Sequence, residues 1–212
     1  MVHIYLANCC SDQFRNRIGD YIQHLPEPLR RKVQSFKQKK DSYRFLLGKI
    51  LLKKGLEKLG YSSLTLDCLQ FSKYNRPYIS NDLDFNISHS GDYVLCVLSK
   101  KCRVGIDIEE LNNINFSHFL QCFTKREWAR INNSVNPLRM FYQLWTRKEA
   151  VLKADGKGLQ VPLLSFEAIC NKVNMDKNQW YIRELAISEG YASSLATDIE
   201  IIDNYSIQKI FS

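Results

Sequence analysis

Apolar and polar residues alternate over residues 103–109, and this two-residue period is typical of a half-buried β-strand. One face carries Val104, Ile106 and Ile108, and the other carries Gly105, Asp107 and Glu109. We expect the apolar face to cover a core and both carboxylates to project from the opposite face. Two carboxylates this close repel each other unless a cation or a shared proton lies between them.

A continuous helical pattern runs from Leu138 to Ala154 and is ended by Asp155-Gly-Lys-Gly158. Glu149 and Lys153 are four residues apart, so they occupy one face of this helix in the favourable Glu-before-Lys order. Three carboxylates with a lysine suggest a hard divalent cation that holds a polyphosphate. Magnesium is usually bound by one or two carboxylates together with substrate phosphate oxygens.

The remaining pattern predicts a helix followed by strands twice, over residues 29–109 and 138–202. In the first half we expect a long helix at 29–59, whose Gly48 and Gly55 would allow close backbone packing. Strands are predicted at 2–7, 64–71, 84–89 and 93–98, and the last two should form an antiparallel meander with 103–109. In the second half a capping box at Thr124 starts a helix. Further strands are predicted at 165–170, 179–187, 191–197 and 199–202.

Composition indicates an ordinary globular protein. The chain has 212 residues, of which 45% are hydrophobic and 25% charged, so one large domain or two intimate halves can bury a core. No run approaches the ~20 apolar residues of a membrane span, and no signal peptide is evident, so we expect a cytoplasmic protein. Seven cysteines without a Cys-x-x-Cys pair favour buried small side chains over disulfides or metal ligands.

The net charge of +8 is concentrated in one stretch. Between Arg30 and Lys54 there are ten Lys or Arg residues and one acid, Asp41. This stretch fits a solvated helix face, a surface for phosphate or an acidic partner, or a nucleic-acid surface.

Three motifs together resemble a known family. Gly105-Ile-Asp-Ile-Glu109 is followed by Trp145-x-x-Lys-Glu149-x-x-x-Lys153 and preceded by Asn86-Ile-Ser-His-Ser-Gly91. This order and spacing resembles the 4'-phosphopantetheinyl transferases, in particular the larger, surfactin-synthetase-activating type. The resemblance is clearest over residues 71–162. It implies an α+β fold with pseudo-twofold symmetry, made of two halves, 1–102 and 103–212, each with a long helix on a small antiparallel sheet.

The resemblance also implies a set of site residues. It assigns Mg²⁺ binding to Asp107, Glu109 and Glu149. It assigns contacts with coenzyme A, the substrate, to Lys32, Arg44, Arg76, Ser88, His89 and Lys153, most of them in the N-terminal half. Without the resemblance the acids would be interpreted as solvated surface groups, and Lys153 as a partner of Glu149 alone. The resemblance implies that Arg76 contacts adenine or a phosphate. It places Lys32 through residues 28–33, where Pro28-Leu29 departs from the basic residues usual in the family.

The implied reaction is attack by a serine hydroxyl of an apo acyl or peptidyl carrier protein on the β-phosphorus of coenzyme A, which releases adenosine 3',5'-bisphosphate. The candidates for the base that accepts the serine proton are Glu149, Glu127 and a metal-bound water. Glu127 has the alternative role of a capping-box residue. Lys153 is a further catalytic candidate. We expect a monomer without nucleic-acid or membrane partners. A carrier would dock on the aromatic and basic segment 112–140. The alternatives are a non-catalytic nucleotide- or RNA-binding module that uses the 30–54 stretch, and a degenerate transferase that serves only as a scaffold.

Overall fold

The computed structural model describes residues 1–212 except residues 62, 64, 202, 203 and 212. The chain divides into two compact units. Unit 1 contains residues 1–101 and 204–212, and unit 2 contains residues 102–203. The expected second half, 103–212, therefore loses its last segment to unit 1, because the final strand pairs with the first one. Among the described residues, no helix is long and apolar enough to span a membrane.

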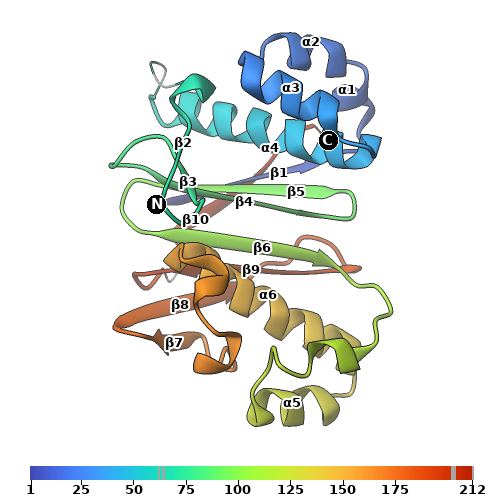
Figure 1. Ribbon diagram of the computed structural model, residues 1–212, viewed down its shortest axis with the longest axis vertical. Helices are drawn as coiled ribbons and strands as arrows, with labels where there is room; N and C mark the ends of the chain where they lie inside the picture. Colours follow the sequence, from blue (N-terminus) through green and yellow to red (C-terminus); the bar gives the residue numbers. More distant parts are fainter. Residues whose placement is uncertain (62, 64, 202–203, 212) are drawn as a thin grey trace. The chain divides into compact units, whose positions relative to one another are not determined.

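Unit 1 is a helical layer on a four-stranded sheet with the order β10-β1-β5-β4 (Figure 1). Its strands are β1 (Val2–Asn8), β2 (Gln70–Phe71), β3 (Pro77–Tyr78), β4 (Asp84–Ser90), β5 (Tyr93–Ser99) and β10 (Tyr205–Lys209). Its helices are α1 (Asp12–Arg15), α2 (Ile18–Gln23), α3 (Glu27–Ser35) and α4 (Lys39–Lys58), with a 3₁₀ turn at Leu66–Cys68. Helix α4 packs on the sheet through buried leucines such as Leu47 and Leu51.

Two predictions for unit 1 were wrong in detail. The helix expected at 29–59 is two helices, because Phe36 is extended (ψ 131°) and Ser42 Oγ donates to the Val33 carbonyl at the end of α3. Strand β5 pairs with β1 and β4, so neither of its edges is open to residues 103–109 and the three-stranded meander does not form. Part of the strand expected at 64–71 lies outside the described residues, and the rest holds the 3₁₀ turn and β2.

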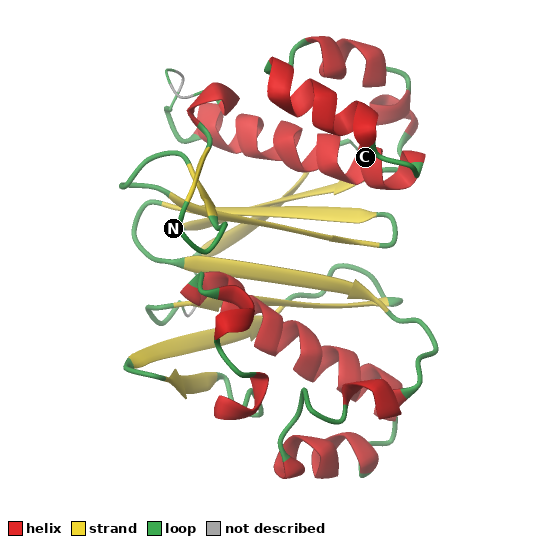
Figure 2. Cartoon of the chain, in the orientation of Figure 1, coloured by secondary structure: helices red, strands yellow, loops and turns green. Residues whose placement is uncertain are grey.

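Unit 2 is built from helix α6 on a second sheet, with the order β6-β9-β8-β7 and antiparallel pairing throughout (Figure 2). Its strands are β6 (Val104–Glu110), β7 (Lys172–Met175), β8 (Asn178–Glu184) and β9 (Tyr191–Thr197). Its helices are α5 (Lys125–Asn132) and α6 (Pro137–Asp155), with 3₁₀ turns at Phe116–Phe119, Gly158–Gln160 and Leu163–Ser165. The expected α+β class, with helices packed on antiparallel sheets, is confirmed.

The ends of helices α5 and α6 follow the local sequence. Thr124 and Glu127 form the predicted capping box, and α6 ends at Gly156, whose φ of 81° is easily adopted only by glycine. The strand predicted at 165–170 is absent from that part of the described chain, and β7 begins at Lys172 instead. The strand predicted at 199–202 is absent at residues 199–201, and the rest of it lies outside the described residues.

Candidate active site

Asp107 and Lys153 form the centre of the candidate site in unit 2. Asp107 lies on β6 and is 3% exposed, and Lys153 lies on α6. The Lys153 ammonium is 2.6 Å from Asp107 Oδ1, so a cation already lies beside this buried carboxylate. Strand β6 and helix α6 thus bring together two residues that are 46 positions apart.

Gly105 explains why β6 and α6 lie so close. A Cβ at this position would be 2.1 Å from the Ala150 carbonyl oxygen and 2.4 Å from the Ala154 amide nitrogen. The absence of a side chain at Gly105 therefore makes room for the α6 backbone. The close approach places Asp107, two residues further along β6, opposite the helix turn that carries Glu149 and Lys153.

A buried hydroxyl pair holds the same helix on the neighbouring strand. Asp107 is in register with Ser194 of β9, and Ser194 Oγ is 3.0 Å from Thr146 Oγ1 of α6. The position of α6 along the sheet is therefore set by hydrogen bonding as well as by apolar packing.

Glu149 experiences the negative charge of this site. Burial, followed by the charge of Asp107, raises the pKa of the Glu149 carboxyl, and Lys153 partly opposes the rise. Glu109 is half-buried two positions beyond Asp107. An all-carboxylate donor set with excess negative charge fits a hard divalent cation such as Mg²⁺. The Lys153 ammonium occupies the position beside Asp107 Oδ1 and must shift if an ion binds to that oxygen.

Glu127 and Lys148 form a fully buried ion pair. Both side chains are 0% exposed, and the Lys148 ammonium is 2.8 Å from Glu127 Oε2 and 2.7 Å from the Phe166 carbonyl oxygen. Glu127 also accepts hydrogen bonds from the amides of Thr124 and Ala168. Glu127 is therefore placed as a structural group that joins α5, α6 and the 166–168 segment, rather than at a solvent-accessible position.

Sequence reasoning missed this pairing. The Lys148 ammonium is buried, and burial lowers its pKa despite Glu127. The available clues were a lysine within the apolar stripe of α6 and an acid in a nearby capping box. Neither clue indicates that the two side chains meet.

In unit 1, Arg44 lies at the end of β4 that carries the serine and histidine. Arg44 donates through Nε and Nη2 to the Gly91 carbonyl at 2.8 and 2.5 Å, and through Nη1 to Asp41 Oδ1 at 3.0 Å. Ser88 is buried and His89 exposed on β4, shortly before this turn. The structure thus brings the arginine next to the turn that follows His89.

The other two predicted contacts of unit 1 are differently placed. Arg76 is 13% exposed, and its Nη2 lies 2.8 and 2.7 Å from the two carboxylate oxygens of Asp84. Lys32 is exposed on α3, with its ammonium 5.3 Å from the Phe36 ring. The structure places Arg76 in an ion pair and Lys32 at an exposed helix end, so their contact with coenzyme A stays a prediction.

The segment expected to dock a carrier is partly core. Phe123 is 2% exposed, and the Phe116 ring stacks on Phe141 with centroids 5.0 Å apart. Leu120 remains 62% exposed, and its carbonyl accepts a hydrogen bond from the Trp128 indole. Phe123 is therefore a core residue, and the exposed part of the segment is smaller than its composition suggested.

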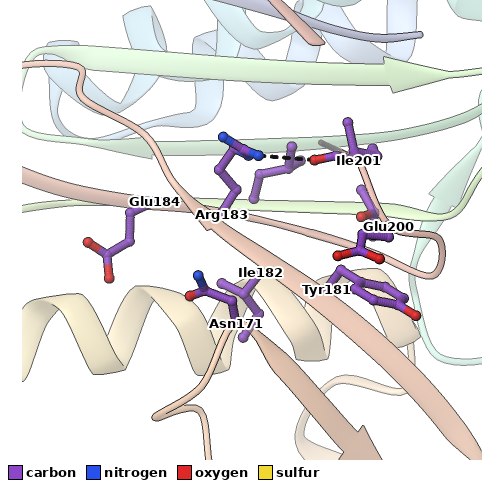
Figure 3. A pocket seen from close by; sticks show the side chains of 9 residues that line it. Asn171, Tyr181, Ile182, Arg183, Glu184, Glu200 and Ile201 are labelled. Carbon is purple, nitrogen blue, oxygen red and sulfur yellow. Dashed lines mark hydrogen bonds between the residues drawn. The ribbon is translucent and has the colours of Figure 1, made fainter. Parts of the chain in front are cut away.

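A pocket of about 630 Å³ lies elsewhere in unit 2 (Figure 3). It is lined by Asn171, Tyr181, Ile182, Arg183, Glu184, Leu195, Thr197, Glu200 and Ile201. Arg183 Nη2 donates to the Ile201 carbonyl at 3.2 Å, as the dashed line shows. On β8, Trp180, the residue before Tyr181, belongs to the core beneath α6, so Tyr181 and Arg183 lie on the opposite face. Among the described residues that line this pocket, none is a predicted site residue.

Comparisons with known proteins agree with both units. The family model described as the 4'-phosphopantetheinyl transferase superfamily matches residues 103–208, and the model of the N-terminal region of 4'-phosphopantetheinyl transferases matches residues 13–101. The chain is 34% identical to the 4'-phosphopantetheinyl transferase gsp of Aneurinibacillus migulanus over 182 residues, which is 81% of this chain and 75% of that protein.

Two further relatives show the same relationship. The 4'-phosphopantetheinyl transferase Sfp of Bacillus subtilis is 34% identical over 77% of this chain and 73% of its own length. The L-aminoadipate-semialdehyde dehydrogenase-phosphopantetheinyl transferase of Schizosaccharomyces pombe is 29% identical over 81% of this chain and 80% of its own length. The chain therefore belongs to the 4'-phosphopantetheinyl transferase superfamily, as its three motifs predicted, and is a transferase.

Proposed function

We propose that this transferase moves 4'-phosphopantetheine from coenzyme A to a serine of an apo acyl or peptidyl carrier protein, in a reaction that depends on Mg²⁺. The observation that carries the proposal is the arrangement of Asp107, Glu149 and Lys153, in which a buried carboxylate of β6 lies close to a glutamate and a lysine of one α6 face. Family membership supports the reaction class.

The chemistry is a phosphoryl transfer. The serine oxygen forms a bond to the β-phosphorus of coenzyme A, the bond from that phosphorus to the bridging pyrophosphate oxygen breaks, and adenosine 3',5'-bisphosphate leaves. Mg²⁺ held by Asp107, Glu109 and Glu149 would neutralise charge on the pyrophosphate. Lys153 is suited to bind a phosphate oxygen. Asp107 holds its ammonium in place, and its side chain is 28% exposed, so a phosphate can reach it.

The serine must lose a proton to a base. Glu127 is ill-suited, because it has no exposure and is held by Lys148 and two backbone amides. Glu149 is the better candidate among the side chains, because it is half-buried on the helix face that carries Lys153. A metal-bound water stays an alternative.

The first test is transfer to an apo carrier protein. The protein, coenzyme A and Mg²⁺ should add the mass of phosphopantetheine to the carrier, and a chelator should prevent the addition. Asp107→Asn and Glu149→Gln should abolish transfer. Glu110→Gln is the matched control, because Glu110 alternates to the other face of β6 and accepts a hydrogen bond from Tyr191. Transfer at the normal rate by Asp107→Asn would contradict the proposal.

The second test concerns the 3'-phosphate of coenzyme A. We propose that Arg44 and His89 bind it, since both lie at the Gly91 end of β4. Dephospho-coenzyme A should then bind more weakly than coenzyme A in calorimetry, because a charge-assisted contact is lost. The difference should shrink in Arg44→Ala. If the unsubstituted protein binds coenzyme A and dephospho-coenzyme A with equal affinity, Arg44 and His89 do not bind the 3'-phosphate.

The same proposal includes a monomeric, cytoplasmic enzyme without nucleic-acid or membrane partners. Light scattering of the purified chain tests the monomer. Gel-shift assays with RNA test the alternative function of the basic stretch at 30–54, which would require binding that falls steeply as salt is added.

A further inference from the structure

Two adjacent cysteines and an aspartate form a cluster in unit 1 that the proposed reaction does not use. Cys9 and Cys10 follow β1, and Asp92 follows the Gly91 turn between β4 and β5. The two sulfur atoms and one carboxylate oxygen all lie within 4.8 Å of one another. In the sequence, the absence of a Cys-x-x-Cys pair favoured the interpretation of the cysteines as buried, apolar side chains. That role fits Cys9, which is 1% exposed, but not Cys10, which is exposed.

The backbone holds these three side chains together. Adjacent residues in a continuing strand would point to opposite faces, but β1 ends at Asn8 and the chain turns. Asn8 Oδ1 accepts a hydrogen bond from the Cys10 amide at 2.7 Å, which fixes the turn. The Cys9 amide donates to the Asp92 carbonyl at 2.8 Å, which fixes the cysteine pair to the other turn.

The donor set selects a class of ion. Two thiolates and one carboxylate match the ligands of borderline and soft divalent cations, whereas Mg²⁺ prefers oxygen alone. Zn–S bonds of about 2.3 Å and Zn–O bonds of about 2.0 Å in tetrahedral geometry separate the donors by roughly 3.5–4 Å. Donors within 4.8 Å of one another reach that spacing with small side-chain movements.

We propose that Cys9, Cys10 and Asp92 bind one thiophilic divalent cation of the Zn²⁺ or Cd²⁺ class. The exposed Cys10 leaves the fourth position to a water molecule. Two S–H bonds break and two metal–sulfur bonds form, and both protons go to the buffer. Burial raises the pKa of the Cys9 thiol to about 11, so the ion must bind thiolate strongly enough to displace that proton.

The surrounding cations are compatible with this site and supply a specific test of it. The Lys40 ammonium is 2.8 Å from Asp92 Oδ1, and Arg15 Nη2 donates to Cys10 Sγ at 3.3 Å. The bound ion and its three anionic ligands carry a net charge of −1, which Arg15 offsets. Lys40, in contrast, competes with the ion for the Asp92 carboxylate, so its removal should tighten binding.

The experiment is a Cd²⁺ titration of the reduced full-length chain in excess Mg²⁺. We expect one strong equivalent by calorimetry, accompanied by thiolate-to-cadmium charge-transfer absorption in the ultraviolet and displaced by Zn²⁺. Cys10→Ser and Asp92→Asn should each weaken binding by at least about tenfold, since losing even an outer-shell partner costs a metal site ~10–100-fold in affinity. Cys10→Ser alters an exposed side chain, so it should leave the fold intact. Lys40→Met should tighten binding.

Three controls separate this site from other cation sites. Cys68→Ser alters one of the half-buried cysteines outside the cluster, and Cys170→Ser alters an exposed one; both should leave affinity unchanged. Asp107→Asn should leave the charge-transfer band unchanged, so failure of the proposed Mg²⁺ site would not affect this result. Absence of the band in the unsubstituted chain, or unchanged affinity in Cys10→Ser, would overturn the proposal. Unchanged affinity in both Asp92→Asn and Lys40→Met would remove the carboxylate from the ligand set.

Discussion

Lys148 and Glu127 form a single buried pair that joins α5 to α6, the helix that carries Glu149. Neither side chain is exposed, and the ammonium reaches both carboxylate oxygens, at 2.9 and 2.8 Å. Because burial opposes the charged form of Lys148, the pair depends on complete hydrogen bonding by both partners. Removing one partner is therefore worse than replacing both.

Lys148→Met is expected to lower the free energy of unfolding by about 3–5 kcal/mol, because it leaves the Glu127 carboxylate buried without its cation. The double variant Lys148→Met, Glu127→Gln should recover part of the loss. Urea denaturation of both variants measures this. Lys125→Met, at an exposed position of α5, is the control and should change stability by less than about 0.5 kcal/mol. A Lys148→Met variant as stable as the unsubstituted chain would show that the pair contributes nothing.

At the scale of secondary-structure elements, the contact between β6 and α6 depends on one missing side chain. Gly105→Ala would place a Cβ 2.1 Å from the Ala150 carbonyl oxygen, so strand and helix backbones must separate. We expect a loss of about 1–3 kcal/mol or more in unfolding free energy. Gly190→Ala is the matched control in the same unit, because its Cβ would meet nothing within 4 Å. Equal stability of the two variants in urea denaturation would contradict this account.

Helix α4 carries a lysine whose charge disfavours folding. Burial lowers the pKa of Lys49, and its ammonium lies 4.9 Å from the Phe45 ring centroid. A lysine pKa that is lower in the folded chain means that the unfolded chain binds more protons. The penalty is therefore complete at low pH and disappears as pH rises through the lowered pKa towards about 10.5.

Lys49→Met should accordingly raise the free energy of unfolding near pH 7, and the gain should shrink as pH approaches 10. Urea denaturation between pH 6 and 10 measures both effects. Lys53→Met, one turn further along α4 and exposed, should show neither. If the gain in unfolding free energy is the same at every pH, the stabilisation comes from packing and not from removal of the lysine charge.

Local pattern predicted the elements that carry the candidate site. Alternation over 103–109 predicted β6, and helical periodicity with a glycine stop predicted α6 almost to the residue. Both signals are local, because they depend on which face of an element is apolar. The residue types suggested a divalent cation with a polyphosphate, and the family resemblance assigned Asp107 and Glu149 to Mg²⁺ and Lys153 to coenzyme A.

Pairing between distant segments could not be predicted in this way. The helix at 29–59 was split by a hydrogen bond from Ser42 to Val33, and helical periodicity is insensitive to such a contact. The strand after β5 joined a different sheet because β1 already occupied the second edge of β5. The role of Gly105 depended on the α6 backbone, 45 residues away at Ala150. Each of these outcomes is decided by tertiary neighbours that a sequence window does not contain.

At the scale of the whole molecule, the chain returns to its first unit to complete a sheet. Strand β10 pairs in parallel with β1 from Val2 opposite Tyr205 to Leu6 opposite Lys209. The ladder is extended at both ends, since the Val2 amide donates to Asn204 and the Ile210 amide donates to Leu6. Phe211 then packs against Phe14 in the core of unit 1. Unit 1 therefore depends on residues that follow unit 2 in the sequence.

Deleting residues 204–212 should destabilise unit 1 and leave unit 2 intact. The deletion exposes the outer edge of β1 and uncovers core side chains that Phe211 covers. Hydrogen exchange should become faster in β1 and β5 and stay unchanged in β8 and β9, because strands of separate cores open independently. Phe211→Ala should reproduce part of the effect, whereas Ile207→Ser, at a 39% exposed position, should not. Faster exchange to the same extent in all four strands would mean that the two units unfold as one cooperative structure.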